Sequence, residues 1–223
     1  MVKVLLSWSS GKDSAWTLHR LRCSGTDVAG LLTSINETAG RVSMHGVRED
    51  IVCAQADAAG LPLFTIPLPW PCSNAIYEER LRAAVERAVA AGFTHVAFGD
   101  LFLEDVRKYR EDRLAGTGLA PIFPLWKLPT GPLARDMIGG GLRARLSTID
   151  PRVMPRESIG ARFDDRFLAT LPAGVDPCGE NGEFHTCVTE GPMFSRPVDV
   201  RRGAIVEREG FVYGDLLLTP SAD

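Results

Sequence analysis

The stretch Leu5-Leu6-Ser7-Trp8-Ser9-Ser10-Gly11-Lys12-Asp13-Ser14 decides the fold expected for this chain. An apolar run leads into hydroxyl side chains, one glycine, a lysine and an aspartate, and a helical pattern follows from Ala15. This order predicts a buried strand, a tight loop and a helix N-terminus. Unpaired N–H groups and the helix dipole at such an end favour a bound anion. We therefore predict that Ser9 to Ser14 hold phosphate; the alternative is a plain turn in which Ser9 or Ser10 caps the helix and Lys12 is solvated.

Two common phosphate loops do not fit this stretch. A Walker A loop needs a glycine five positions before its Gly-Lys pair and Ser or Thr directly after the lysine. Leu6 and Asp13 occupy those positions here. A dinucleotide fingerprint needs three glycines, and this loop has only Gly11. The loop therefore belongs to another class of phosphate site.

Composition sets the outer limits of the interpretation. The chain has 223 residues, a net charge of −3 and 45% hydrophobic residues, which is ordinary for a globular protein of one large or two small domains. This charge gives no general footprint for nucleic acid. No apolar run approaches the roughly eighteen residues of a membrane span, and a signal-peptide plan is lacking. The five cysteines form no C-x-x-C pair, so we expect free thiols in a reducing cytoplasm.

The first half of the chain alternates between strand and helix patterns. Strands are expected over 2–8, 27–35, 63–67, 94–98 and 122–126, and helices over 15–23, 49–59, 74–91 and 104–114. Such alternation is typical of βαβ units, so we expect a Rossmann-like, five-stranded parallel sheet in an α/β protein. Ligands of such sheets bind at the carboxyl ends of the strands. Ser7–Ser14, Thr33–Asn36 and Gly99–Asp100 should therefore converge.

The second half has a different character. Proline and glycine interrupt it repeatedly after Trp126, with strands expected over 143–149 and 211–218 and a helix over 162–171. We predict a nucleotide-binding domain over residues 1–127 and a smaller, mixed α/β domain over 128–218. Residues 219–223 are expected to be a disordered tail.

The loop Ser9-Ser10-Gly11-Lys12-Asp13-Ser14 resembles the pyrophosphate-binding loop of the N-type ATP pyrophosphatases, usually S-G-G-K-D-S. These enzymes belong to the adenine nucleotide alpha-hydrolase-like superfamily. The resemblance implies that ATP is split into AMP and pyrophosphate while a carbonyl or similar oxygen is adenylated. Ser10 stands where the family has glycine, a change that would be costly if the backbone there needs a positive φ.

Four later segments resemble one branch of this group, the diphthine–ammonia ligase family. They are Gly99–Arg113, Pro124–Trp126, Cys178–Thr186 and Gly191–Phe194. With the first loop they span roughly residues 2 to 197 in the family's order. The resemblance implies an AMP-forming, ATP-dependent amide ligase that uses Mg²⁺, ammonia or another amine, and a carboxylate substrate. That substrate would be diphthine on elongation factor two if the family activity is kept.

The resemblance and the strand ends together give a list of site residues. Those expected to bind ATP are Leu6, Ser7, Ser9, Ser10, Gly11, Lys12, Asp13, Ser14, Ser34, His45 and Gly99. Those expected in catalysis are Lys12, Asp13, Asp100, Glu180 and Glu183, with Asp13 and Asp100 as contacts of Mg²⁺. Those expected to bind the second substrate are Arg110, Gly179, Glu180, Gly182, Glu183, Phe184 and Thr186.

The chemistry of the second group also follows from its residue types. Glu180 and Glu183 are paired carboxylates in a glycine-rich turn, able to bind a cation or accept a proton, and Phe184 could add a cation–π contact. The alternative is a solvated turn. His185 and Thr186 should point to opposite faces of a strand, so that one packs inward.

Several residues keep two interpretations. Asp100 could instead cap the next helix. Arg107, Arg110 and Arg113 share a helix face that is either solvated or a pyrophosphate site. His45 could lie in a surface loop, and His185 could be a core histidine.

Two other functions remain open at this stage. One is a tRNA-modifying ATP pyrophosphatase, although thiolating members usually need paired cysteines. The other is a non-catalytic adenine-nucleotide sensor. The chain offers no membrane partner, nucleic acid is disfavoured, and a homodimer is left open.

Overall fold

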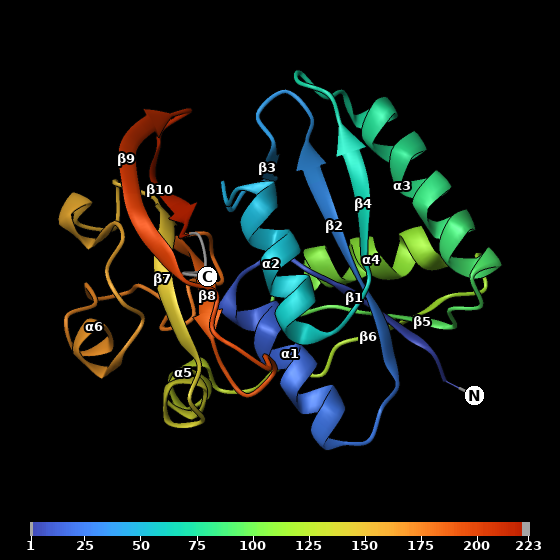
Figure 1. Cartoon of the computed structure of the whole chain (residues 1–223), viewed down its shortest axis with the longest axis horizontal. Helices are drawn as coiled ribbons and strands as arrows, with labels where there is room; N and C mark the ends of the chain where they lie inside the picture. Colours follow the sequence, from blue (N-terminus) through green and yellow to red (C-terminus); the bar gives the residue numbers. More distant parts are fainter. Residues whose placement is uncertain (1, 220–223) are drawn as a thin grey trace.

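The computed structural model describes residues 2–219, and its strands form two separate sheets (Figure 1). The first contains five parallel strands in the spatial order β4-β2-β1-β5-β6. They are β1 (Val4–Ser7), β2 (Val28–Asn36), β4 (Leu63–Leu68), β5 (His95–Ala97) and β6 (Ala120–Ile122). The Rossmann-like parallel sheet is confirmed. A two-residue strand, β3 (Arg41–Val42), adds an antiparallel pair at the end of β2.

Helices cover both faces of the parallel sheet (Figure 1). They are α1 (Lys12–Cys23), α2 (Glu49–Ala59), α3 (Asn74–Ala90) and α4 (Glu104–Leu114). Side chains of β1 alternate between the faces: Val4 and Leu6 pack in a cluster with α1 and α2, while Leu5 packs with residues of α3 and α4. This double burial explains why the β1 segment is apolar throughout.

The second sheet is antiparallel, with the spatial order β8-β7-β10-β9. Its strands are β7 (Arg143–Ile149), β8 (Phe184–Glu190), β9 (Val200–Arg208) and β10 (Phe211–Leu218), accompanied by α5 (Thr130–Gly139), a 3₁₀ turn (Arg156–Ser158) and α6 (Asp165–Ala169). The largest apolar cluster runs from α1 and α2 into this sheet without a break, through Leu146, Phe184 and Val188. The two sheets thus share one core.

The structure differs from the expected secondary structure in one strand and one helix. The strand expected over 122–126 lies at Ala120–Ile122, and the residues after it form a turn in which the amide of Trp126 donates to Phe123. Pro124, which has no amide hydrogen, prevents the strand from continuing there. Helix α5 was missed because Gly131 and Pro132 read as breakers, although proline is tolerated in a first helical turn.

Other expectations need smaller changes. Strand β9 was missed because both of its faces are largely exposed, which removes the alternating pattern. Of the residues 162–171, which were expected to form a helix, only those of α6 are helical. In the expected tail, the amide of Thr219 donates to the carbonyl of Asp199 (2.9 Å), and residues 220–223 lie outside the described part. No helix among residues 2–219 combines the length and apolarity that a bilayer crossing requires.

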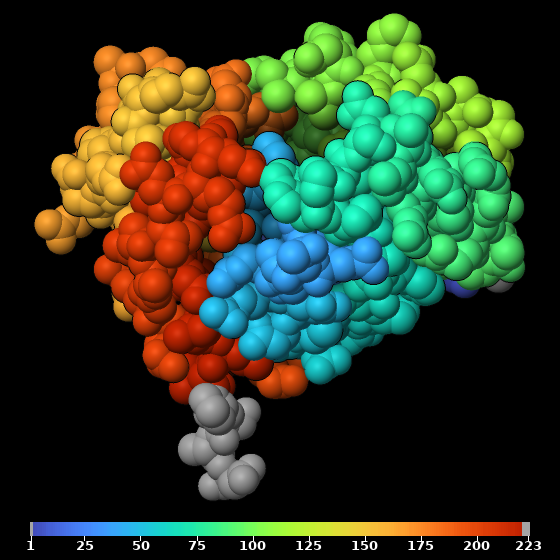
Figure 2. Space-filling view, turned by 90° about the horizontal axis from the view of Figure 1, so that it is seen from above, coloured from blue at the N-terminus to red at the C-terminus, as the bar shows by residue number. Residues whose placement is uncertain are grey.

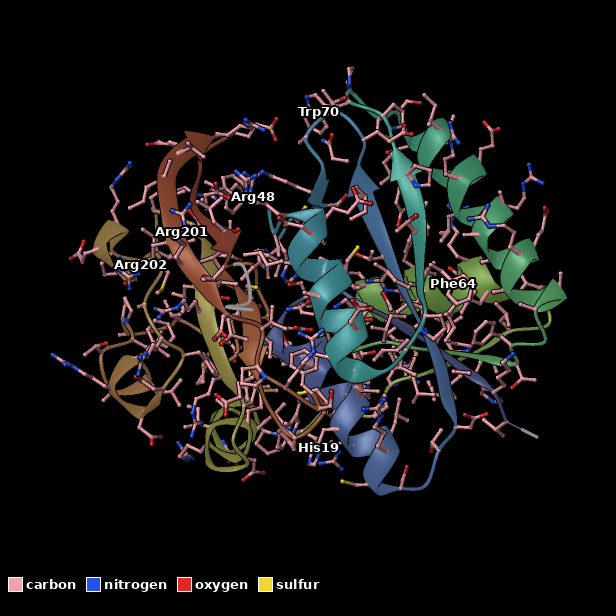
Figure 3. The ribbon with its side chains drawn as sticks, in the orientation of Figure 1. His19, Arg48, Phe64, Trp70, Arg201 and Arg202 are labelled. Atoms are coloured by element: carbon pink, nitrogen blue, oxygen red, sulfur yellow. The ribbon has the colours of Figure 1, made fainter. Side chains whose placement is uncertain are left out.

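An ion-pair cluster joins the two sheets at their edge. Asp215 of β10 has a side chain that is 12% exposed. It accepts hydrogen bonds from Arg41 of β3 (2.9 Å) and from Arg48, the N-cap of α2 (2.7 and 2.9 Å). Figure 3 labels Arg48 where it faces the second sheet.

We expect Asp215→Asn to lower the free energy of unfolding by about 2 kcal/mol, because hydrogen bonds to a charged group are each worth roughly 1.5–3 kcal/mol. Urea denaturation measures this change. The control is Asp199→Asn, an exposed position that should stay within about 0.5 kcal/mol of the unchanged protein. Equal stability of the two variants would show that the cluster does not join the sheets.

Candidate functional site

The loop between β1 and α1 is held by its own hydroxyl groups. The Oγ atoms of Ser9 and Ser14 lie 3.1 Å apart, and Ser14 Oγ donates to the carbonyl of Gly11 (2.9 Å). Gly11 is the N-cap of α1 and makes no side-chain cap bond, so neither Ser9 nor Ser10 is the N-cap residue. Within residues 2–219, the amides of Asp13 and Ser14 have no protein acceptor. The helix end therefore presents free donors, as an anion site requires.

Ser10 adopts the backbone conformation that favours glycine. Its φ is 71°, and its side chain is fully buried with Oγ 3.6 Å from Cys187 Sγ. The carbonyl of Ser10 accepts from the amide of Val188 (2.9 Å) and from Gln55 Nε2 (3.3 Å). The expected cost of serine at this position is therefore real, but the loop keeps its shape because two segments, α2 and β8, hold it.

Lys12 does not extend into solvent. Its side chain is 2% exposed, and Nζ pairs with Asp13 Oδ2 (2.8 Å) and donates to the carbonyl of Cys178. The ammonium lies over the rings of Phe163 (5.6 Å) and Phe184 (5.3 Å). Burial by itself lowers the pKa of Lys12, but the surrounding acidic groups, Asp13 first among them, together raise this pKa above its ordinary value. The solvated alternative for Lys12 is wrong.

Three carboxylates from separate segments approach each other beside the loop. Glu180 Oε1 accepts from the amide of Leu101 (2.7 Å), and Asp100 Oδ2 from Arg110 Nε (3.3 Å). Asp13 keeps Oδ1 buried without a hydrogen-bond partner. Burial raises the pKa of Glu180 to about 7, and the charges of Asp13 and Asp100 add to this. A carboxyl that titrates near neutrality is suited to accepting or donating a proton.

Glu183 has a different place from Glu180. It is buried, and it accepts hydrogen bonds from the amide of Asp176 (3.0 Å) and from the amide and side chain of Asn181 (3.0 and 2.9 Å). Gly179 and Gly182 in the same turn have positive φ values of 68° and 88°. The structure thus places Glu183 and the glycines as the frame that presents Glu180.

Phe184 corrects the expectation of a substrate contact. Its side chain is 1% exposed and packs edge-on against Phe167 (5.3 Å between centroids). The cation over its ring is Lys12, so the cation–π contact is internal. Thr186 is also buried, and its Oγ1 accepts from the amide of Lys12 (3.1 Å). His185 points to the more exposed face, as the strand alternation predicts.

His45 reaches the phosphate loop from the segment between β3 and α2. A Cβ on Gly11 would lie 2.7 Å from His45 Cε1, and His45 Nδ1 is 3.3 Å from the carbonyl of Thr186. The rings of His45 and His185 lie 4.5 Å apart. Burial lowers the pKa of His185 to about 4 and that of His45 well below its usual range. Both imidazoles are therefore neutral at pH 7.

Gly99 and Ser34 lie at strand ends, as expected. A Cβ on Gly99 would approach the carbonyl carbon of Asp13 to 2.9 Å, so only glycine lets β5 end against the first turn of α1. Ser34 lies near the end of β2, and its carbonyl accepts a hydrogen bond from the amide of Ser43 (3.1 Å). The space-filling view shows a hollow where green segments that follow β5 face orange segments of the C-terminal half (Figure 2).

The three arginines of α4 separate. Arg110 turns toward Asp100 and lies over Phe98 (4.8 Å), whereas Arg107 pairs with Glu111 and Arg113 with Glu78. Among residues 2–219 no three potential metal ligands come together, so a cation at this place would have at most two protein ligands.

Gln55 was missed in the sequence. It is fully buried and links Trp8 Nε1 (3.0 Å), Ser10 and the carbonyl of Val188 (2.7 Å). The available signal was a single amide on the apolar face of the helix 49–59.

Comparison with known families shows which family the chain belongs to. Residues 2–119 match the family model of the diphthamide synthase N-terminal domain, and residues 132–215 match that of the diphthamide synthase C-terminal domain. The chain belongs to the diphthamide synthase family.

Curated relatives carry the name diphthine–ammonia ligase. The one from Schizosaccharomyces pombe is 24% identical over 92% of this chain, and this chain spans only 37% of that protein. The relatives from Homo sapiens and Bos taurus are each 23% identical over 89% of this chain and 82% of their own length. The diphthamide synthase family thus accounts for both halves of the structure.

The left-handed backbone at Ser10 gives a direct test. Ser10→Ala and Ser10→Gly remove the same hydroxyl group, but only glycine avoids the Cβ strain of positive φ, which costs about 1–2 kcal/mol. We expect the glycine variant to be more stable than the alanine variant by about 1 kcal/mol in urea denaturation. An alanine variant as stable as the glycine variant would mean that no strain is stored in this loop.

Proposed function

We propose that this protein is an AMP-forming, ATP-dependent ligase that adenylates a carboxylate and then forms an amide with ammonia. The observation that carries the proposal is the position of Glu180 beside the phosphate loop. Its carboxyl has a pKa of about 7 and is fixed to the amide of Leu101, next to Asp100 at the end of β5. The named activity of the diphthine–ammonia ligase relatives supports this assignment.

The residues of the β1–α1 loop supply the nucleotide site in this proposal. Ser9, Gly11, Asp13 and Ser14 surround the free end of α1, and His45 covers Gly11. Leu6, Ser7 and Ser34 at the neighbouring strand ends would face the adenosine part. Residues 1–127 would thus bind ATP, and residues 128–218 would contribute the second substrate's side of the site. Catalysis would come mostly from positioning and fixed charge.

The donor set of the loop fits Mg²⁺. Asp13 Oδ1 is a buried carboxylate oxygen without a partner, and Asp100 lies nearby at a strand end. Carboxylate oxygens are ligands that Mg²⁺ prefers. Asp13 and Asp100 would hold the ion, which would neutralise charge on the phosphates. Burial raises the pKa of Asp13, and Lys12, fixed to it, opposes this shift and would align the carboxylate.

The reaction balances with the groups on hand. A substrate carboxylate oxygen attacks the α-phosphorus of ATP, and the bond to pyrophosphate breaks. Ammonia then attacks the activated carbonyl carbon, AMP leaves, and one proton must be lost from nitrogen. Glu180 would accept that proton. Its carboxylate, with Asp100, would also favour a cationic substrate such as the trimethylammonium group of diphthine, so we propose diphthine on elongation factor two as the acceptor.

The thiols give no support to sulfur transfer on tRNA. All five cysteines are free, and burial raises the pKa of Cys187 to about 12 and that of Cys178 well above its usual range. Neither buried thiol is a nucleophilic thiolate at neutral pH.

The product ratio tests the proposed reaction. With ATP, Mg²⁺, ammonium and diphthine-bearing elongation factor two, we expect AMP, pyrophosphate and amide in equal amounts. Glu180→Gln should lower kcat about 100-fold, the lower range for a lost acid–base group. Glu190→Gln, an exposed acid at the end of β8, is the matched control. ATP binding without any turnover would favour a nucleotide sensor and contradict the ligase assignment.

The pH profile tests the role of Glu180. The carboxyl must be ionised to accept a proton, and its raised pKa is about 7, so kcat/KM should fall as pH drops through 7. The assay keeps the concentration of unprotonated ammonia constant at each pH, because ammonia itself titrates. A profile that is flat between pH 6 and 8 under these conditions would remove Glu180 as the base.

A further inference from the structure

We propose that the second sheet carries a separate binding site for a phosphate-type oxyanion, in a cavity of about 620 Å³ lined by four arginines. The arginines are Arg145 of β7, Arg162 of the segment before α6, Arg166 of α6 and Arg202 of β9. Figure 3 labels Arg202 on β9, on the side of the molecule away from the parallel sheet. The proposal is independent of the ligase assignment.

Like charges are brought together by the backbone at this place. Arg145 and Arg162 form a directly opposed antiparallel bridge. The guanidinium groups of Arg145 and Arg202 both donate to one carbonyl, that of Gly160. Like charges directly opposite each other on neighbouring strands destabilise a sheet. The fold thus maintains an unfavourable arrangement that a bound dianion would turn into a favourable one.

Protein carboxylates do not neutralise these arginines. Within residues 2–219, none of the four takes part in an ion pair, whereas nearby Arg152 and Arg156 each pair with an acid. The cavity wall also contains Glu157 and Asp164, but Asp164 is occupied as the N-cap of α6, accepting from Phe167 (2.9 Å). Four cationic and two anionic side chains leave the cavity positively charged.

The cavity is distinct from the phosphate loop. Phe167 lines it and packs against Phe163 and Phe184. The rings of Phe163 and Phe184 in turn contact the ammonium group of Lys12. This aromatic layer lies between the two cationic centres. A phosphate held by the β1–α1 loop cannot therefore satisfy the four arginines.

The residue type indicates the chemistry of the ligand. Guanidinium groups present planar pairs of donors that match phosphate oxygens, and they remain charged at all physiological pH values. The cavity is open to solvent, and Arg162, Arg166 and Arg202 are exposed, so an anion can reach all three. The ligand class is a multiply charged phosphate, either free as phosphate or pyrophosphate or as the phosphate group of a nucleotide.

The test is thermal unfolding and calorimetric titration with inorganic phosphate, pyrophosphate and AMP, at an ionic strength held constant with NaCl. We expect at least one of these anions to raise the unfolding temperature of the unchanged protein, and the one that binds tightest identifies the source. Arg162→Gln and Arg202→Gln should each weaken that binding at least tenfold. Arg201→Gln is the control, because it removes the same charge from the adjacent position, which does not line the cavity.

Stability without anion separates a binding site from a structural cluster. Relief of the like-charge pair should leave Arg162→Gln at least as stable as the unchanged protein when no phosphate is present. A less stable Arg162→Gln would show that the arginine supports the fold instead. Undiminished anion binding in both cavity variants would place the anion at the β1–α1 loop, and either that result or no stabilisation beyond NaCl would overturn the proposal.

Discussion

The buried Lys12–Asp13 pair, covered by the C-terminal half of the chain, is the interaction on which the rest of the site depends. Lys12 Nζ is bonded to Asp13 and to the carbonyl of Cys178, and its amide donates to Thr186. The carbonyl of Ser10 accepts from Val188 in the same strand. Thr186 and Val188 of β8 thus hold the loop from both ends, so the geometry of the phosphate loop depends on the second sheet.

The same contact assembles the chemistry of the site. Once β8 lies on α1, the turn before it carries Glu180 to the amide of Leu101, at the end of β5. Glu183 fixes that turn through its hydrogen bonds, and the ring of Phe184 makes a cation–π contact with the ammonium group of Lys12. Each half supplies part of the acidic cluster, and burial between them is what raises the pKa of Glu180 to about 7. Residues of both sheets thus contribute to one candidate site.

Local patterns were sufficient for the features that depend on neighbours in sequence. The strand–loop–helix at Ser9–Ser14 and the parallel sheet follow from apolar runs and helical periodicity. The burial of Lys12 and the structural place of Glu183 could not be predicted, because both depend on contacts with residues far apart in the chain. Strand β9 gave no signal, since an exposed edge strand need not alternate. Ser10 lay between these cases: the sequence marked the position, and its φ of 71° gave the reason.

The most direct test of this account is calorimetric titration of ATP into Thr186→Val. The substitution keeps the shape of the side chain but removes the acceptor for the amide of Lys12, a bond worth about 1 kcal/mol. Thr189→Val, later on the same strand and away from the loop, is the matched control. The account predicts about fivefold weaker ATP binding for Thr186→Val alone, with the fold retained in both variants. Unchanged ATP affinity in Thr186→Val would contradict the claim that the second sheet shapes the phosphate loop.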